Sequence, residues 1–104
     1  MSGTSVVAKR LKDARLRAGL SQKELGIRAG MDQFSASSRV NQYERGKHVP
    51  DLLTAERLAN ILGVPTPFLY ARDDLLANWI LAFAIVNPGS PSVHFPESRA
   101  SDFV

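Results

Sequence analysis

The sequence contains no cysteine, which excludes disulfide bonds, thiolate metal sites and thiol chemistry. Long apolar runs are also absent. The longest, Trp79 to Val86, has eight residues, whereas a membrane-spanning helix needs roughly 20. The first residues lack the charged segment and the apolar segment of a secretory signal. We therefore expect no membrane partner and a location in the reducing cytoplasm.

Catalytic and metal-binding patterns are missing as well. His48 and His94 are far apart, and no acidic residue has a spacing that would complete a metal site with them. The serines stand in no nucleophile motif, and there is no glycine-rich phosphate loop. Nothing assembles a nucleophile, a base and an oxyanion site. We expect no metal, no cofactor and no enzymatic activity.

The charge of the chain is unevenly distributed. Its 104 residues suit one domain, and its hydrophobic content of 44% is typical of a soluble globular fold. Residues 1–50 carry a formal charge of +6, whereas residues 51–104 carry −3. A basic half attracts phosphate backbones and gives non-specific affinity for nucleic acid. The alternative is a solvated surface with no partner.

The first two predicted helices form a pair. The first has apolar residues at three- and four-residue spacing, with charged residues at the other positions, and it ends at Gly19. Its apolar residues are Val6, Val7, Leu11, Ala14 and Ala18; its charged residues are Lys9, Arg10, Lys12, Asp13 and Arg17. Ser21 and Glu24 have the spacing of a capping box, which predicts a second helix that stops at Gly30.

A third helix is predicted to begin between Ser35 and Ser37 and to end at Gly46, which we expect in the left-handed conformation. Its inward residues are Val40 and Tyr43, at i and i+3. Tyr43 is therefore expected in the core, the alternative being a base-stacking residue. Pro50 disfavours helix at Val49, so the following link is extended.

Three further helices complete an all-α chain. A fourth runs from about Asp51 to Leu62, and a short fifth runs from Pro67 to Ala71 with Thr66 as its N-cap. A sixth, apolar nearly all round, runs from Leu75 to Val86 and can be capped by Asp73 or Asp74. A strand is an alternative for Trp79 to Val86. We expect a domain over residues 1–72, the apolar helix within 73–87, and a flexible tail over 88–104.

Four blocks in the sequence carry a family resemblance. They are Arg15-x-x-x-Gly19-Leu20-Ser21-Gln22-x-x-Leu25, then Val40-Asn41-Gln42-Tyr43-Glu44-Arg45-Gly46-Lys47, then Pro50, then Leu58-Ala59-x-x-Leu62-Gly63-Val64. In this order and spacing they resemble the phage-repressor and Cro-like (XRE) helix-turn-helix family, over about 60 of the 104 residues. The resemblance implies a compact five-helix repressor-like domain. Its third helix reads the DNA major groove, usually in a dimer on a near-palindromic operator.

One segment departs from the family pattern. The turn before the third helix is about four residues longer here, with the extra residues around Asp32-Gln33-Phe34-Ser35. These residues either extend the third helix backwards or form a protruding turn near the DNA. The roles implied by the resemblance therefore apply to Val40 to Lys47, and the segment Met31 to Ser35 has no assigned role.

The resemblance and the residue types together suggest a DNA-binding surface. Gln22 matches the family position that bonds a phosphate beside a helix N-terminus, the alternative being an exposed capping-region residue. Arg45 and Lys47 suit phosphate contacts, and as cations at a helix C-terminus they also stabilise the helix dipole. The candidate base readers, whose amides, hydroxyls and guanidinium can pair with base edges, are Ser37, Ser38, Arg39, Asn41 and Gln42. Simple solvent exposure is the alternative for each.

By the same resemblance, Arg15 and Glu44 form a partly buried ion pair between the first and third helices. This role is structural and not one of reading DNA. Removing one partner would leave a buried charge unpaired, at a cost of ~3–5 kcal/mol.

The apolar helix Leu75 to Val86 suggests a partner. One of its faces can cover the domain, and the other can meet a second copy of the chain in a homodimer. The alternative is packing within one chain, with the tail folded over the helix.

We predict a sequence-specific DNA-binding transcriptional regulator, with repression the expected outcome and a cytoplasmic, nucleoid-associated location. The rivals are an antitoxin whose apolar segment binds a toxin, and an interaction adaptor without DNA binding.

Overall fold

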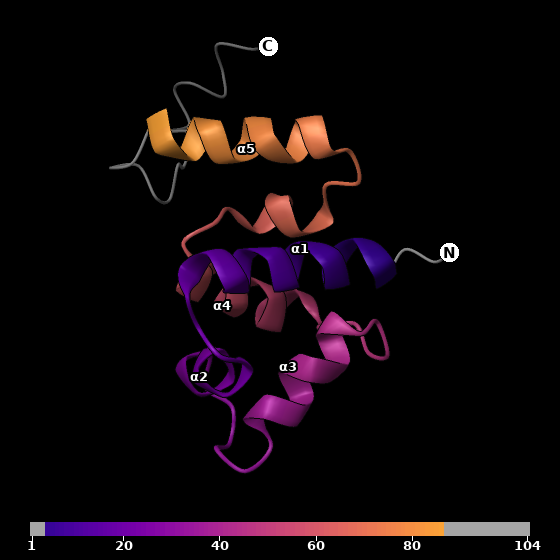
Figure 1. Ribbon diagram of the computed structural model, residues 1–104, viewed down its shortest axis with the longest axis vertical. Helices are drawn as coiled ribbons and strands as arrows, with labels where there is room; N and C mark the ends of the chain where they lie inside the picture. The colour runs from indigo at the N-terminus through magenta and orange to yellow at the C-terminus, as the bar shows by residue number, and fades with distance from the viewer. Residues whose placement is uncertain (1–3, 87–104) are drawn as a thin grey trace.

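The computed structural model describes residues 4–86, and every regular element in that span is helical (Figure 1). In chain order the elements are α1 (Thr4–Ala18), α2 (Gln22–Arg28), α3 (Ala36–Glu44), α4 (Leu52–Leu62), the 3₁₀ helix η1 (Thr66–Tyr70) and α5 (Asp74–Val86). The predicted all-α class is confirmed, and the alternative of a strand from Trp79 to Val86 is wrong. The predicted flexible tail, 88–104, lies outside the described residues.

The helices surround one apolar core. In Figure 1, α1 crosses the middle of the molecule with α2 and α3 below it, while η1 and then α5 lie above. Each of the first five elements contributes at least one large, fully buried side chain: Leu11, Leu25, Val40, Leu58, Phe68 and Leu69. Burial of such a side chain stabilises the fold by about 1.5–3 kcal/mol. The first five elements therefore share one core, and α5 packs against this core at η1.

Two of the predicted helix-end features, the capping box of α2 and the glycine after α3, are confirmed. The Ser21 hydroxyl accepts a hydrogen bond from Glu24 N at 3.0 Å, and Ser21 N donates to the Glu24 carboxylate at 2.9 Å. This is the predicted capping box. Gly46 has a φ of 74°, as predicted for the residue that ends α3, because a side chain there would clash with the backbone. Each of these features depends on residues close in sequence.

The predicted N-cap at Thr66 is wrong. The residue in the capping position is Pro65, and Thr66 is already inside η1. Phe68 N donates to Pro65 O at 2.9 Å, an i to i+3 bond that closes a 3₁₀ turn one residue earlier than expected. At α5 the cap is Asp73, whose carboxylate accepts from Leu75 N at 2.7 Å, while Asp74 lies in the first turn of the helix.

The predicted placement of Arg10 on the charged face of α1 is also wrong. Arg10 is only 6% exposed. Its Nε donates to Ala71 O at 2.8 Å, its Nη2 lies 2.8 Å from Asp74 Oδ1, and its guanidinium sits 5.9 Å from the centroid of the Phe68 ring. Ala18, expected among the apolar residues that face the core, is exposed at the end of α1. Arg10 thus connects α1 to the junction between η1 and α5.

Candidate nucleic-acid interface

Helices α2 and α3 approach each other closely at Gly26. A Cβ added to Gly26 would lie 2.7 Å from Ala36 Cβ, closer than real side chains come. Ala36 is fully buried at this contact and is the first residue of α3. Sequence reasoning missed Gly26, although a glycine inside a helix costs ~1 kcal/mol relative to alanine and so indicates a packing requirement. The contact fixes the helix pair as a unit.

One face of α3 is buried in the core, and the opposite face points away from it. Ala36, Val40 and Tyr43 point into the core, as predicted for Val40 and Tyr43. The opposite face carries residues at i, i+3, i+4 and i+7, which lie in one row along a helix: Ser38, Asn41, Gln42 and Arg45. Ser38 and Arg45 are exposed, and Asn41 and Gln42 are half-buried. We call these four residues the outer row.

The other candidates on α3 flank the outer row. Ser37 is exposed one position before Ser38. Arg39 is exposed, and its Nη2 donates to the Tyr43 hydroxyl at 3.2 Å, which places it at the edge nearest the core residues. Lys47 is exposed just beyond Gly46, where its backbone N–H donates to Gln42 O at 2.9 Å. Amide, hydroxyl and cationic groups therefore occupy one side of α3 and its C-terminal end.

Gln22, the first residue of α2, is directed towards α3. Its side-chain Nε2 donates to Asn41 Oδ1 at 3.2 Å and to Glu44 Oε1 at 3.1 Å. A phosphate at this helix end would meet the first backbone N–H groups of α2, which have no partner within the helix. The Gln22 bond also affects Asn41. The bond uses one lone pair of the Asn41 carbonyl oxygen and orients the amide, whose two N–H donors can then serve a ligand.

The Arg15–Glu44 ion pair lies beneath this surface. Arg15 donates through Nε and Nη2 to the two carboxylate oxygens of Glu44, with the Nη2–Oε1 distance 3.0 Å, and through Nη1 to Leu20 O at 2.9 Å. The side chains are 11% and 3% exposed. A two-pronged pair of this kind is strong and geometrically specific. It ties α1, the turn before α2, and the end of α3 together.

The longer segment before α3 forms a turn. The Asp32 carboxylate accepts from Phe34 N at 2.9 Å, and Asp32 O accepts from Ser35 N at 3.1 Å. Because α3 begins only at Ala36, the extra residues do not extend the helix backwards. The turn lies at the lower end of the molecule in Figure 1, and the Phe34 side chain is 88% exposed.

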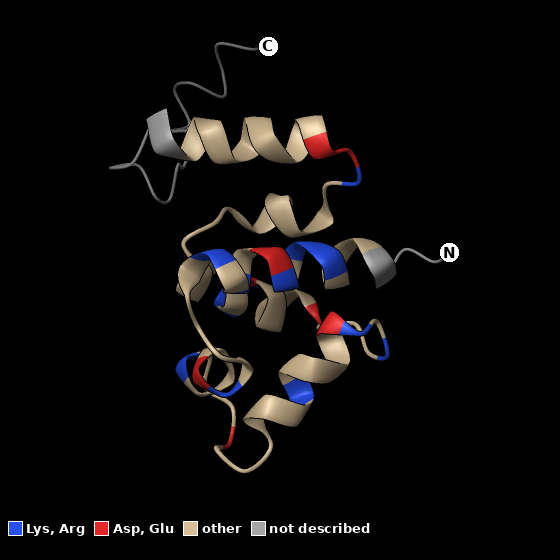
Figure 2. Cartoon of the chain, in the orientation of Figure 1, with Lys and Arg blue, Asp and Glu red and all other residues tan. Residues whose placement is uncertain are grey.

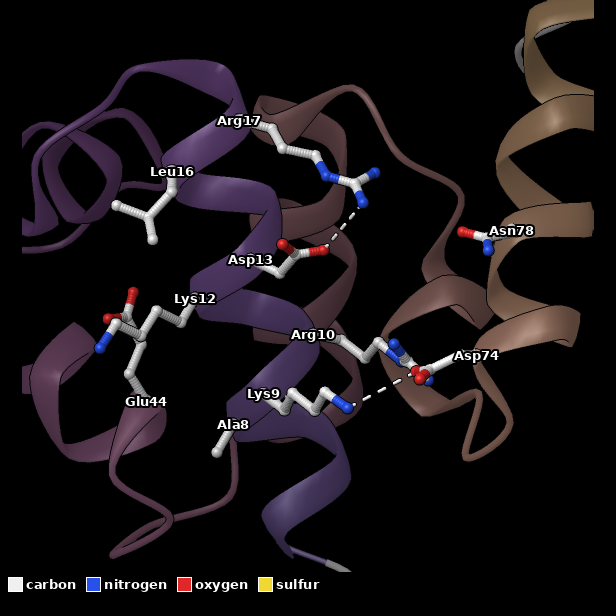
Figure 3. A pocket seen from close by; sticks show the side chains of 10 residues that line it. All are labelled: Ala8, Lys9, Arg10, Lys12, Asp13, Leu16, Arg17, Glu44, Asp74 and Asn78. Carbon is white, nitrogen blue, oxygen red and sulfur yellow. Dashed lines mark ion pairs between the residues drawn. The ribbon is translucent and has the colours of Figure 1, made fainter.

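Charged residues lie mainly on the elements that precede α5. Figure 2 shows Lys and Arg on α1 to α4 and on the links after α3 and before α5, whereas α5 itself carries charge only at its start. The hollow in Figure 3, along α1 and facing α5, is lined by residues of both signs, including Lys9, Asp13 and Asp74. Across residues 4–86 no cluster of histidines and carboxylates could hold a metal ion. Within the same span no helix is both long and apolar enough to cross a membrane.

Two packed helices, with a polar outer row on the second and an ion pair holding it to the first helix of the domain, define a helix-turn-helix protein. The helix-turn-helix family model matches residues 11–69, and the chain belongs to this family. The predicted family resemblance is therefore confirmed.

Named relatives agree with this assignment. The chain is 33% identical over 69 residues to the HTH-type transcriptional regulator ImmR of Bacillus subtilis, covering 66% of this chain and 51% of the relative. It is 41% identical over 70 residues to the SPbeta prophage-derived regulator YonR of the same organism, covering 64% and 61%. A crystal structure of the transcriptional regulator BswR is 56% identical, with a TM-score of 0.70 and coverage of 72% and 74%. The chain thus spans between about half and three-fifths of the length of these two curated relatives.

Proposed function

We propose that the protein is a sequence-specific DNA-binding transcriptional regulator that inserts α3 into the major groove. The observation that carries the proposal is the outer row, Ser38, Asn41, Gln42 and Arg45, set opposite the buried residues of the same helix. The major groove admits one α-helix, and amide and guanidinium groups match its base edges. The relatives, described as transcriptional regulators, support the same role.

The surrounding groups have distinct roles in this proposal. The N-terminus of α2 at Gln22 and the cations Arg45 and Lys47 contact phosphates on either side of α3. Gln42 reads a base, and Asn41, whose oxygen is held by Gln22, donates to an acceptor such as guanine O6 or N7. Ser37 and Ser38 bond a base edge or a phosphate, and Arg39 contacts the groove edge. Repression is the outcome we propose, because a regulator bound where its operator overlaps a promoter excludes the polymerase.

Selection of bound sequences from a random DNA pool with the full chain tests the proposal. We expect a near-palindromic site and an affinity that falls steeply as salt rises, because phosphate contacts release counterions. Gln42→Ala should relax preference at one base pair per half-site by ~1–3 kcal/mol, while Asn60→Ala on exposed α4 should leave preference unchanged. An adaptor without DNA binding would give no enrichment at any salt, and that result would contradict the proposal.

We propose that α5 is the dimer contact and that its occupant is a second copy of the chain. Ala77 is buried, and Ile80 and Leu81 are partly buried against the domain. Leu75, Leu76 and Trp79 are 59%, 49% and 66% exposed on a helix without charge beyond its first residue. A two-fold dimer matches the symmetry of a near-palindromic operator.

The dimer is tested by sedimentation equilibrium of the full chain. Wild type should sediment as a dimer, and Trp79→Asp should sediment as a folded monomer with reduced affinity for the full operator. Leu53→Asp, at a similarly exposed position on α4, serves as the matched control and should leave the dimer intact. A monomeric wild type that binds only half-sites would overturn the dimer, and would leave the antitoxin reading of this face as the alternative.

A further inference from the structure

Phe34 has an unusual position for an aromatic residue. At 88% exposure it is the most exposed of the large apolar side chains within residues 6–84, where side-chain burial is described. Burying such a side chain would stabilise a protein by about 1.5–3 kcal/mol, and the described residues do not provide that burial for Phe34. A single exposed apolar residue is common, so its exposure alone carries no function. Two further features suggest a function: hydrogen bonds fix the turn that carries Phe34, and this turn lies beside the N-terminus of α3.

The turn that carries Phe34 is held in place on both sides. Its own N–H donates to the Asp32 carboxylate at 2.9 Å, and the next N–H, that of Ser35, donates to Asp32 O at 3.1 Å. Directly after Ser35, the buried Ala36 packs on Gly26 of α2. The backbone at Phe34 is thus fixed relative to the helix pair, and the ring is presented to solvent from a defined position.

This position adjoins the N-terminal end of α3. In helix-turn-helix complexes the N-terminal residues of the second helix contact base edges. Beside Phe34, the first exposed residues of α3 are Ser37 and Ser38, whose side chains are short. A longer apolar side chain next to them can reach the groove floor without competing with them for the same hydrogen bonds.

The chemistry of the ring limits what it can recognise. A phenyl ring makes no hydrogen bond to a phosphate oxygen and no ionic contact with it. The apolar group on the base edges of the major groove is the C5-methyl of thymine, a known contact for phenylalanine. We infer that Phe34 is a specificity-determining residue that contacts a thymine methyl in each half-site, beside the base pair nearest the N-terminus of α3. The inference rests on the proposed function.

Replacement of single thymines by deoxyuridine in the selected operator tests this directly, because it removes the methyl and leaves the hydrogen-bonding edge unchanged. Wild type should lose about three- to fivefold in affinity at one thymine per half-site, the effect expected of one buried methyl group. Phe34→Ala should bind the thymine operator more weakly and should bind the deoxyuridine operator with the same affinity as the thymine operator. Gln33→Ala, in the same turn, should keep the wild-type sensitivity to the methyl group.

The possible failures are distinguishable. If Phe34→Ala retains full affinity, or remains as sensitive to deoxyuridine as wild type, the inference is overturned while DNA binding stands. If Phe34→Ala changes the sedimentation mass but not base preference, the ring serves a protein contact and the inference is again overturned. Absence of operator binding by the wild-type chain overturns both the inference and the proposed function. Because the ring is exposed, thermal melting of Phe34→Ala should match wild type, which separates recognition from folding.

Discussion

Buried cations in this molecule are held by partners far away in sequence. Arg10 reaches the carbonyl of Ala71, 61 residues later, and Arg15 reaches the carboxylate of Glu44, 29 residues later. The periodicity of α1 allows Arg10 to lie next to Leu11 on the inner side. Sequence analysis nevertheless places an arginine on the solvent side, because its hydrogen-bond acceptors are known only once the fold is known. The Arg15–Glu44 pair was implied by resemblance alone, since nothing in the local pattern points from one residue to the other.

Removal of one partner of the Arg15–Glu44 pair should destabilise the fold. With side chains 11% and 3% exposed, Glu44→Ala leaves the Arg15 guanidinium unpaired in a nearly dry site. We expect a loss of ~3–5 kcal/mol in the free energy of unfolding, measured by urea denaturation. Glu56→Ala, on the exposed side of α4, should change it by less than about 0.5 kcal/mol.

Loss of DNA binding in Glu44→Ala should follow the unfolded fraction and recover on cooling or with stabilising osmolyte. A variant that melts like wild type but fails on DNA would show that Glu44 acts at the interface instead.

At the scale of the elements, short-range signals predict where helices begin and end, and tertiary contacts decide the rest. Ser21, Glu24 and Gly46 specify their helix ends through bonds within a few residues. The two alternatives for the segment before α3 could not be separated, because the start of α3 depends on how Ala36 packs against α2. Thr66 failed as a cap for a similar reason, since Pro65 already provides the extended residue that precedes η1.

Gly26→Ala should separate α2 from α3. Alanine improves helix propensity by up to ~1 kcal/mol, but its Cβ would lie 2.7 Å from Ala36 Cβ and 3.0 Å from the Ala36 backbone. Overpacking of this kind costs ~1–3 kcal/mol, so we expect a net loss of stability in urea denaturation.

The double variant Gly26→Ala/Ala36→Gly removes the nearest contact but keeps the two backbone contacts, so it should recover stability in part. A single variant as stable as wild type would mean that the helix pair adjusts freely, contrary to the rigid unit described above.

For the whole molecule, the sequence predicts more of the architecture than of the surface. The helix order, the core residues Val40 and Tyr43 and the family follow from periodicity, caps and motif spacing. The links between Gln22 and Asn41 and between Arg10 and the η1–α5 junction could not be predicted, because they are formed only when distant elements dock. The DNA-binding roles of the site residues stay predictions.

The junction between the domain and α5 should respond to acid. A hydrogen bond from Arg10, with the nearby charge of Lys9, holds the pKa of Asp74 below its ordinary value. A carboxylate with a lowered pKa in the folded state stabilises that state above its unfolded pKa, about 3.9, and loses this contribution as pH falls through the folded value. Stability of the wild type should therefore decline in this acidic range.

Asp74→Asn isolates this contribution from other groups. The carboxyls of Glu24 and Asp51, which also have lowered pKa values because they cap helices, will contribute to the same decline. Urea denaturation at several pH values should show a difference between wild type and Asp74→Asn near neutrality that vanishes at the lowest pH. A difference that persists undiminished would show that the ionised form of Asp74 is not what stabilises the junction.

The hydrogen bonds from Arg10 to the Ala71 and Arg72 carbonyls restrict how α5 can move relative to the domain, and this matters for the proposed dimer. If α5 joins two chains, this junction sets the distance and twist between their two α3 helices. DNA completes a turn in 10–10.5 base pairs, so one inserted base pair rotates a half-site by roughly 35° away from its helix. A rigid junction therefore restricts the dimer to operators with one half-site spacing. Arg10→Ala should widen the range of half-site spacings that the dimer binds.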